Sequence, residues 1–378
     1  MVGKLGSFVV IAALVSGAAF AQQTVNVIGL YELSGAGATA GTNFKNGVEL
    51  AAKEINAAGG ILGRKIETVA YDTQSQPGVA KGLAKRAIDE GAYVVMGPVF
   101  SGSIIVSMAE TKQAEITNFT GGEASNITAQ GNPYIFRTSF NQSAGMPKLA
   151  NYINNELKAK SVSVVYVNND FGKGGRDAMV KELGARNIKV AADVSTESNQ
   201  ADFSAAVLKV KQANADALFA YVNEEESARL LRELRKQGYD KPILGETTLM
   251  GQKVIDLAGD AANGIKGHVG LTIDAPNPLV KAFAEKYERE FKIKSDHNGI
   301  KGYTGMYLVK AATEKVGKFD TKALAQAIKG QKFAAKDTPG LLMDVSFDDK
   351  GDLDRESYMV EVKGGKQIVA TTLPALSK

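Results

Sequence analysis

MGPVFSGS, residues 96–103, joins an apolar run with the composition of a buried strand, residues 93–96, to a helical pattern over residues 104–113. This segment is therefore predicted to be a strand-to-helix turn. At such a turn, unpaired backbone N–H groups and the positive end of the helix dipole point beyond the carboxyl end of the strand. Ser101 and Ser103 add hydroxyl donors, which makes the turn a candidate anion site. The alternative is that Ser101 only caps the helix, since serine is a favoured N-cap residue.

Strand-like and helical segments alternate on both sides of this turn. The N-terminal series has strands at 25–30, 65–71, 92–96, 115–119 and 134–136, with helices at 43–57, 79–90 and 104–113. A second series starts with a helix at 148–157 and continues with strands at 161–167, 188–194, 217–222, 242–245 and 267–271 and helices at 173–183, 203–212 and 225–236. Because such alternation is typical of βαβ units, we predict an α/β fold of two doubly wound, Rossmann-like lobes.

The C-terminal third is predicted to complete these lobes rather than to form a third one. It has helical patterns at 279–291, 301–315 and 321–328, and strand-like pieces near 345, at 357–362 and at 367–370. Three helices with few strands fit best as additions to sheets already begun. The chain must then cross between the lobes three times, near 140–144, near 271–275 and at 349–351. The predicted domains are 22–141 plus 273–349 for lobe 1, and 142–272 plus 350–378 for lobe 2.

Residues 1–21 have the pattern of a secretory signal peptide. Lys4 is followed by the apolar run 8–15 and then by Ala19-Phe20-Ala21, an A-x-A cleavage signature. We therefore predict cleavage after Ala21 and export to the periplasm. No later segment approaches the ~20 uninterrupted apolar residues of a membrane-spanning helix, so the mature chain is expected to be soluble.

Composition excludes several classes of function. The formal charge of +4 falls to +4 − 1 = +3 once Lys4 is removed, and acidic and basic residues are interleaved, as in residues 229–236. This pattern indicates solvated helix faces and gives no support for nucleic-acid binding. The chain has no cysteine, which excludes cysteine nucleophiles, thiolate metal sites and redox dithiols.

Residues 35–40, GAGATA, match the dinucleotide fingerprint G-x-G-x-x-G/A between a predicted strand and a predicted helix. The acidic residue that would hold the ribose should follow about 20 residues later. The nearest fit, Asp72, lies 37 residues after Gly35. A glycine-rich loop against some other ligand is therefore favoured over a dinucleotide site, and a plain turn is the third interpretation.

No other group of residues indicates catalysis. His268 lies in a strand-like run and His297 in a hydrophilic turn, and the adjacent side chains of residues 295–297 cannot form a nucleophile, base and orienting group in line. The carboxylates of residues 224–226 are interpreted as complementing a helix dipole, because three consecutive side chains point in different directions. The protein is therefore expected not to be an enzyme and to need no cofactor or metal.

Several longer segments carry a family resemblance. They are LSGAGATAGTNFKNGVELAAKEINAAGGILGRKIE (33–67), YDTQSQP (71–77), VVMGPVFSGS (94–103), NPYIFRT (132–138), VVYVNNDFGKGG (164–175), ADFSAAVLKVKQANADALF (201–219) and FDDKGD (347–352). In this order they closely resemble the periplasmic substrate-binding proteins of ABC importers of the leucine/isoleucine/valine-binding type. The resemblance implies two lobes joined by a three-stranded hinge, which close over a small ligand between them.

The resemblance also implies which residues would contact the ligand. In the near lobe it assigns a carboxylate-binding hydroxyl to Ser101, with Val99 and Phe100 beside it and with Gly122 and Glu123 on the next loop. In the far lobe it assigns the covering aromatic ring to Phe171. Further far-lobe positions fall on Tyr221, Asn223, Glu246 and Thr247, and the last two stand where amino-acid binders of the family carry the acid that holds the ligand's ammonium group.

The function implied is that of a monomeric binding protein which delivers a small organic acid or amino acid, branched-chain-like or aromatic, to the permease of an ABC importer. The alternative from another class is an exported ligand-sensing receptor of the same fold that signals to a different membrane partner.

Overall fold

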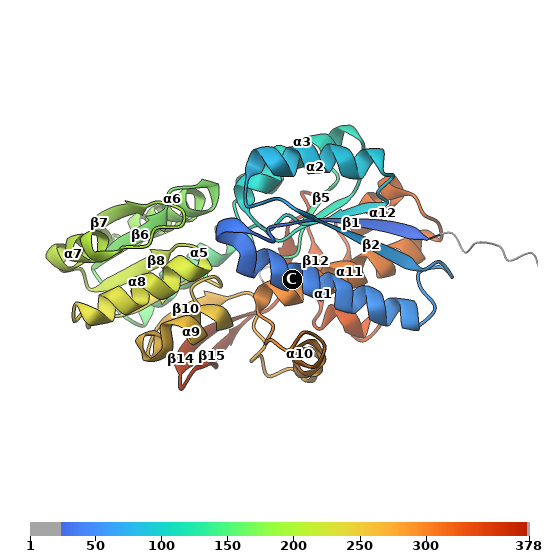
Figure 1. The fold of residues 1–378 in the computed structure, drawn as a ribbon. Coiled ribbons are helices and arrows are strands. Elements are labelled where there is room, and N and C mark those ends of the chain that lie inside the picture. The colour runs from blue at the N-terminus through green and yellow to red at the C-terminus, as the bar shows by residue number, and fades with distance from the viewer. Residues whose placement is uncertain (1–23, 376–378) are drawn as a thin grey trace, which may run out of the picture.

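The computed structural model describes residues 24–375, which form two lobes side by side (Figure 1). The predicted signal peptide and its cleavage site lie outside the described residues. The first lobe is built on a parallel sheet with the order β2-β1-β3-β4-β5, and its strands are β1 (Val25–Tyr31), β2 (Ile66–Asp72), β3 (Val94–Met96), β4 (Asn118–Thr120) and β5 (Ile135–Arg137). Strands β3, β4 and β5 are buried throughout, and β3, at the centre of the sheet, is a short continuous apolar run.

The second lobe is built on a sheet with the order β15-β14-β10-β9-β8-β6-β7. Its strands are β6 (Ser161–Val167), β7 (Lys189–Thr196), β8 (Ala217–Tyr221), β9 (Ile243–Gly245), β10 (Lys266–Val269), β14 (Ser357–Lys363) and β15 (Lys366–Leu373). Pairing is parallel from β7 to β10, and the hairpin β14–β15 adds an antiparallel edge. The C-terminal strands thus complete a sheet that was begun earlier, as predicted.

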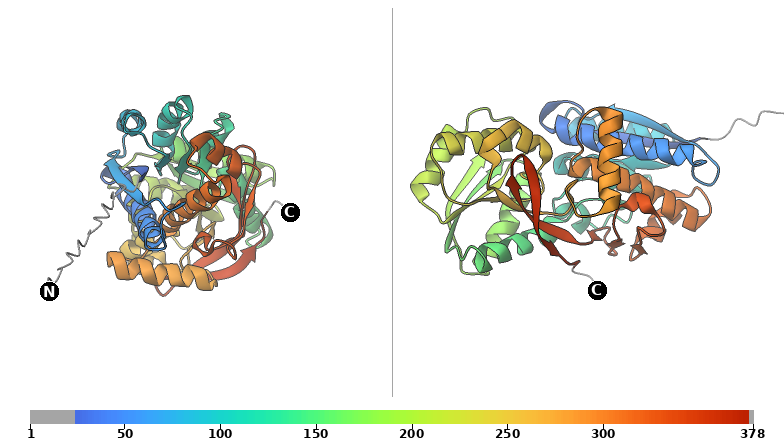
Figure 2. Two further views of the ribbon diagram at one scale, coloured as in Figure 1. Left: turned by 90° about the vertical axis from the view of Figure 1, so that its right-hand side faces the viewer. Right: turned by 90° about the horizontal axis from the view of Figure 1, so that it is seen from below.

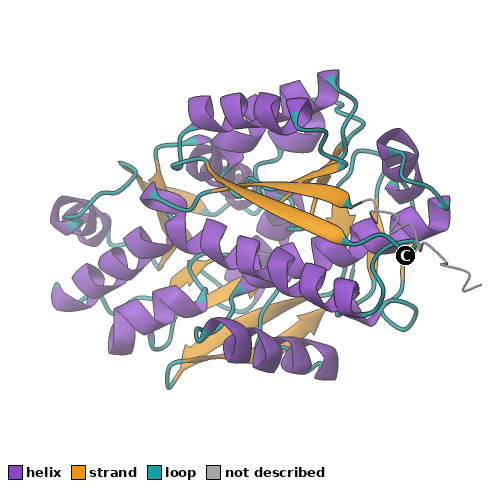
Figure 3. Ribbon diagram, turned by 45° about the vertical axis from the view of Figure 1, so that its right-hand side comes forward, coloured by secondary structure: helices purple, strands orange, loops and turns teal. Residues whose placement is uncertain are grey.

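Helices cover both sheets, as Figure 3 shows. The first lobe has α1 (Ala38–Ala57), α2 (Pro77–Asp89), α3 (Ser101–Gln113) and the short α4 (Asn126–Ala129), and the C-terminal third adds α10 (Pro278–Phe291), α11 (His297–Val316) and α12 (Thr321–Ile328). The second lobe has α5 (Gln142–Asn155), α6 (Asp170–Gly184), α7 (Ser204–Ala213), α8 (Glu224–Lys236) and α9 (Gln252–Ala258). Among residues 24–375, no helix has the length and apolar character needed to cross a membrane.

The third crossing between the lobes lies later than predicted. Residues 348–352 form the turn between β12 (Val345–Phe347) and β13 (Leu353–Asp354), which pair with β11 (Lys332–Phe333) in a small antiparallel sheet. The Arg137 N–H donates to the Gly351 carbonyl at 3.1 Å, so this turn lies against β5 of the first lobe. The predicted boundary at 349/350 therefore falls within a hairpin turn. The crossing follows β13, and β14 and β15 lie where the two lobes meet (Figure 2).

Several helices begin earlier than their apolar periodicity predicts. Helix α1 begins at Ala38 rather than 43, and α11 begins at His297 rather than 301. Helix α5 starts at Gln142 and continues through Pro147, where the predicted pattern began only after the proline. These first turns are polar or glycine-rich. Polar caps begin two of the helices, Asn141 for α5 and Asp296 for α11, whereas α1 has Gly37 at its N-cap.

Helices α1 and α11 lie in close contact, and glycines allow this. A Cβ atom added at Gly47 would stand 2.1 Å from the Gly299 carbonyl oxygen, and one added at Gly302 would stand 2.1 Å from the Phe44 carbonyl oxygen. Any side chain at either position would force the helices apart. This close packing fixes the first turn of α11 against the first lobe and at the edge of the space between the lobes.

Candidate ligand-binding site

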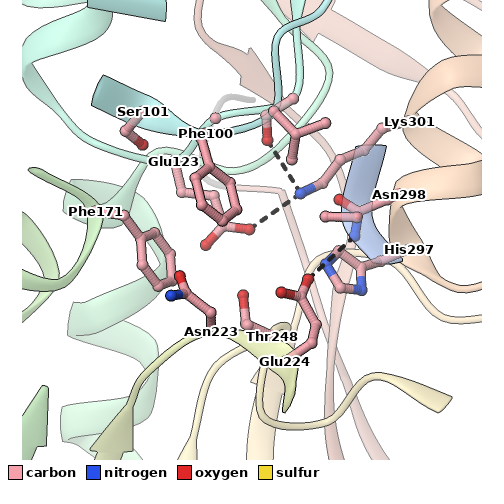
Figure 4. Close-up of a pocket in the computed structure, with 14 residues that line it drawn as sticks. Phe100, Ser101, Glu123, Phe171, Asn223, Glu224, Thr248, His297, Asn298 and Lys301 are labelled. Carbon is pink, nitrogen blue, oxygen red and sulfur yellow. Dashed lines mark hydrogen bonds and ion pairs between the residues drawn. The ribbon is translucent and has the colours of Figure 1, made fainter. Parts of the chain in front are cut away.

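A cavity with about 340 Å³ of space not filled by atoms, part of it open to solvent, is lined by residues of both lobes (Figure 4). Seven of the ten residues predicted from the sequence line it: Val99, Phe100, Ser101, Gly122, Glu123, Phe171 and Asn223. The other lining residues are Ala40, Gly121, Glu224, Thr248, His297, Asn298 and Lys301. Both lobes therefore contribute to one site.

The turn that precedes α3 forms one wall, and it is held by a buried acid that sequence reasoning did not single out. The Glu32 carboxylate is fully buried and accepts hydrogen bonds from the N–H groups of Val99 at 3.0 Å and Phe100 at 3.2 Å. Burial raises the pKa of Glu32 to about 7, although these hydrogen bonds favour the charged form. Two of the N–H groups of the turn are thus already occupied and are not free for an anion.

Ser101 is the first residue of α3 and lines the cavity. The N-cap position belongs to Phe100, so the alternative interpretation of Ser101 as an N-cap residue is wrong. Its hydroxyl oxygen accepts from the Ala124 N–H at 3.3 Å, and its side chain is 2 % exposed. The serine hydrogen remains able to donate to a group in the cavity, close to the positive end of the α3 dipole.

The glycine-rich loop supports the cavity from outside. Residues 35–37 form a short 3-10 turn before α1, and Ala40, in the first turn of α1, lines the cavity. The Asp72 carboxylate accepts from the N–H groups of Leu33 at 2.9 Å and Ser34 at 3.2 Å and from the Ser34 hydroxyl at 2.7 Å. Because Asp72 is used to hold the loop, it does not take the ribose-binding role of a dinucleotide site.

A buried ion pair lies at the centre of the site. Lys301, on the first turns of α11, donates to Glu123 Oε1 at 3.2 Å and to the Gly121 carbonyl at 3.1 Å. The Lys301 side chain is 3 % exposed and that of Glu123 is 11 % exposed. The Tyr221 hydroxyl donates to Glu123 Oε2 at 3.2 Å, so both oxygens of this carboxylate have a donor. Lys301 was missed because nothing in a helical pattern distinguishes one buried lysine from the exposed ones around it.

Aromatic rings of the second lobe form the opposite wall. Phe171, at the start of α6, lines the cavity, and its ring stacks on that of Tyr221 with centroids 4.2 Å apart. Tyr221 lies behind Phe171 and does not line the cavity itself. It also accepts from Gln142 Nε2 at 3.0 Å and is buried, and burial raises the pKa of its hydroxyl well above the ordinary value. Its position therefore supports Phe171 and Glu123.

The first turn of α8 adds two polar lining residues. Asn223 is the N-cap, and the Glu226 carboxylate accepts from its backbone N–H at 3.1 Å and its side-chain amide at 2.8 Å. Glu224, the next residue, points into the site and is 4 % exposed. Burial, with smaller contributions from Glu225 and Asp296, raises the pKa of Glu224 to about 8. The interpretation of this acidic cluster as a dipole complement is therefore incomplete, since one member lines the cavity.

The first turn of α11 provides the remaining polar groups. The Asn298 side-chain amide is fully buried and donates through Nδ2 to Glu224 Oε1 at 3.4 Å. His297 also lines the cavity, and burial together with the Lys301 ammonium lowers the pKa of its imidazole well below its ordinary value. The sequence predicted a surface or core role for His297 in a hydrophilic turn, and the structure places this residue in the first turn of α11, buried beside the cavity. Within residues 24–375, no three His, Asp or Glu side chains are grouped to hold a metal ion.

Glu246 and Thr247, predicted near the ligand's ammonium group, do not line the cavity. The Glu246 carboxylate contacts His268 Nδ1 at 2.9 Å, and burial raises its pKa despite this contact. The Thr247 hydroxyl accepts from the Gly270 N–H at 3.4 Å. Thr248, one residue later, does reach the cavity. The strand end was located correctly, but the direction of each side chain depends on the turn that follows β9.

Side-chain hydrogen bonds join the lobes around the cavity. Among them, Tyr221 donates to Glu123, Asn298 donates to Glu224, and the Thr39 hydroxyl on α1 donates to the Glu225 carboxylate on α8. In each pair one residue belongs to the first lobe and the other to the second. The lobes are therefore in direct contact around the cavity, as in a closed cleft.

Comparisons with known proteins agree with this geometry. The model of the family "Periplasmic binding protein" matches residues 24–367. The leucine-, isoleucine-, valine-, threonine- and alanine-binding protein of Pseudomonas aeruginosa is 25% identical over 341 residues, 90% of each chain. The Leu/Ile/Val-binding protein of Escherichia coli K12 is 27% identical over 325 residues, 85% of this chain and 86% of that protein.

Solved structures show the same fold. The branched-chain amino acid transporter substrate-binding protein LivJ of Streptococcus pneumoniae, in complex with isoleucine, is 25% identical with a TM-score of 0.84, covering 93% of this chain and 100% of that chain. A solute-binding protein of an ABC transporter from R. palustris, in complex with benzoate, is 24% identical with a TM-score of 0.86, covering 94% and 98%. Both are type I periplasmic binding proteins in fold, as predicted. Since the family match runs through both lobes and all three connections between them, this chain belongs to the periplasmic binding protein family.

Proposed function

We propose that this protein captures a small organic acid or amino acid, branched-chain-like or aromatic, between its lobes in the periplasm and delivers it to the permease of an ABC importer. The observation that carries the proposal is the cavity whose polar and aromatic walls come from both lobes. Its relatives in Pseudomonas aeruginosa and Escherichia coli are named as binding proteins for leucine, isoleucine and valine, and the first also for threonine and alanine, which supports this ligand class.

The cavity walls have the chemistry that such a ligand needs. Ser101 at the start of α3 offers a hydroxyl to a carboxylate, close to the positive end of the helix dipole. Val99, Phe100 and Phe171 offer apolar surface to a side chain or ring. One chain supplies both walls, so a monomer is sufficient to hold the ligand.

The interlobe hydrogen bonds suggest how binding is reported to the permease. They form only when the lobes meet, and a ligand that touches both walls adds contacts that the open form lacks. Such a ligand shifts the population toward the closed form. The permease would recognise the surface that this closed form presents.

A thermal-shift screen of the mature chain, residues 22–378, tests the ligand class. The panel contains aliphatic and aromatic amino acids, aromatic acids, short amides and polyols. A ligand present at 100 times its dissociation constant should stabilise the protein by about 2.7 kcal/mol. If no organic acid or amino acid shifts the unfolding transition, the proposal fails. Uptake of the labelled ligand by cells that lack the gene tests delivery, since unchanged uptake would favour a sensing role.

A further inference from the structure

Glu32, behind the ligand-binding turn, is a buried carboxylate with backbone donors and no cation. It follows β1, is fully buried, and accepts from the N–H groups of Val99 at 3.0 Å and Phe100 at 3.2 Å. Among residues 24–375, no lysine, arginine or histidine forms an ion pair with it. A desolvated carboxylate without a cation is costly. The two N–H groups are therefore the main support of its charged form.

Glycines at the start of α1 make room for this acid. A Cβ atom added at Gly41 would stand 2.1 Å from the Glu32 carbonyl oxygen, and one added at Gly37 would stand 2.9 Å from Glu32 Cβ and 2.7 Å from the Phe100 ring. A side chain at either position would displace Glu32 or the ring that lines the cavity. Gly37, the second glycine of the dinucleotide-like match, thus accommodates an internal acid.

The groups that contact Glu32 are uncharged. They are Gly37 and Gly41 on the start of α1, and the N–H groups of the turn before α3. Carboxylates on neighbouring elements are held by donors of their own, because Asp72 accepts from the loop that follows Glu32 and Glu123 pairs with a lysine. The charge of Glu32 is therefore balanced by the turn before α3 alone.

The neutral form of Glu32 also has a place in this environment. The Ser103 hydroxyl lies close enough to favour the charged form, but its geometry is not that of a hydrogen bond, and within the described part of the chain it has no partner. The O–H of a neutral carboxyl needs an acceptor, and the Ser103 oxygen is an unoccupied one beside it. Burial raises the pKa of Glu32 to about 7, so both forms are accessible near neutral pH.

Glu32 and the cavity share one helix N-terminus. Val99, Phe100 and Ser101 line the cavity and Glu32 does not, so Glu32 lies behind the turn. The N–H groups of residues 101–103 have no acceptor within α3, because they open the helix. An anion at Ser101 would use the same positive helix end that Glu32 already occupies. Two like charges there raise each other's energy, and protonation of one removes the repulsion.

We propose that Glu32 is a specificity-determining residue behind the site, which opposes an anion at Ser101 while it is charged and admits the anion once it has taken up a proton from solvent. This inference rests on the proposed function, in which Ser101 receives the ligand's carboxylate, and adds that capture of a carboxylate is coupled to proton uptake. By linkage, the bound carboxylate raises the proton affinity of Glu32, and the affinity for the carboxylate falls as the pH rises.

The first test follows Glu32 directly by carbon-13 NMR of protein labelled at its glutamate carboxyl carbons. The Glu32 signal is assigned by its loss in Glu32→Gln, and its pKa is measured with and without saturating L-leucine, L-phenylalanine or benzoate. A bound carboxylate should increase the proton affinity of Glu32 on the order of 10-fold. L-leucinamide and benzamide, which lack the carboxylate, should not increase it. A carboxylate probe that binds and leaves the pKa of Glu32 unchanged overturns the proposal.

The second test measures the same coupling as affinity, by isothermal titration between about pH 6 and about pH 9. Across this range, wild type should lose on the order of 10-fold more affinity for a carboxylate probe than Glu32→Gln loses. Other titrating groups near the cavity, Glu224, Asp296 and His297, are present in both proteins, so the difference between the two profiles isolates Glu32. Glu110→Gln, toward the other end of α3, is the matched control and should keep the wild-type profile.

The outcomes separate this role from a structural one. If Glu32 only holds the turn, Glu32→Gln should weaken binding equally at every pH, and such parallel profiles would overturn the inference while ligand capture stands. If Glu32→Gln does not fold, Glu32→Asp assigns the NMR signal and the wild-type measurement decides. If L-leucine, L-phenylalanine and benzoate all fail to bind, the proposed function and this inference fall together.

Discussion

Lys301→Met tests the ion pair at the centre of the site. Methionine has nearly the length of lysine, so the substitution removes the ammonium group with little change in packing. It leaves the buried Glu123 carboxylate with the Tyr221 hydroxyl as its remaining donor and the Gly121 carbonyl without its 3.1 Å contact. Breaking a buried pair by removing one partner costs about 3–5 kcal/mol. Since Tyr221 still donates, we expect a loss near the lower value, about 3 kcal/mol.

The assay is urea unfolding followed by far-ultraviolet circular dichroism, because the chain contains no tryptophan to serve as a fluorescent probe. A further result follows from the same reasoning. The double variant Lys301→Met with Glu123→Gln should recover much of the loss, since it buries no unpaired charge. If Lys301→Met lowers the free energy of unfolding by less than about 1 kcal/mol, Lys301 and Glu123 do not act as a buried charge pair. The same conclusion would follow if adding Glu123→Gln made the loss larger.

Three other predictions concern the cavity walls. Ser101→Ala should weaken the binding of a carboxylate ligand by about 1–3 kcal/mol, as measured by isothermal titration. Ser107→Ala is the control and should not weaken it, because the Ser107 hydroxyl donates to the Ile104 carbonyl within α3. Equal effects of the two substitutions would remove Ser101 from the site. The raised pKa of Glu224 means that, between pH 4.5 and about pH 8, the folded wild-type protein binds more protons than the unfolded chain. The melting temperature of the wild type should therefore fall relative to that of Glu224→Gln as the pH rises through this range. Parallel pH profiles of the two melting temperatures would contradict this. Thr39→Val removes the hydroxyl that donates to Glu225 across the cleft, so ligand affinity should fall by about 0.5–1.5 kcal/mol while the ligand-free melting temperature changes little; the reverse would make this contact a stabilising one only.

The near-lobe wall could be predicted because its position follows from sheet topology. Residues 99–101 and 122–123 directly follow β3 and β4, and parallel strands place their carboxyl ends at one edge. Strands such as β6, residues 161–167, were predicted with correct bounds because an apolar run bounded by polar residues is a local signal. The family resemblance supplied Phe171 and Asn223, which no local pattern distinguishes.

The α11 wall could not be predicted in this way. Lys301, Asn298 and His297 follow no strand of the first series, and a helix from the C-terminal third brings them to the site. Their first turn lacks apolar periodicity because its side chains are turned to a polar cavity rather than to a hydrophobic core. The same cause explains the late predicted start of α1, whose Ala40 lines the cavity. Glu246 illustrates the remaining difficulty, since a shift of one or two residues in the turn after β9 decides which side chain lines the cavity.

The hydrogen bond between Asn298 and Glu224 has a kinetic consequence. Helix α11 is fixed to α1 through the glycine contacts at Gly47 and Gly302, so Asn298 moves with the first lobe, whereas Glu224 moves with the second. The two side chains are adjacent only while the lobes are together. A ligand that contacts both Asn298 and Glu224 would dissociate no faster than the lobes separate. Such ligands should therefore differ from weaker ligands chiefly in their dissociation rate. Residence time on this protein would then measure the lifetime of the closed form.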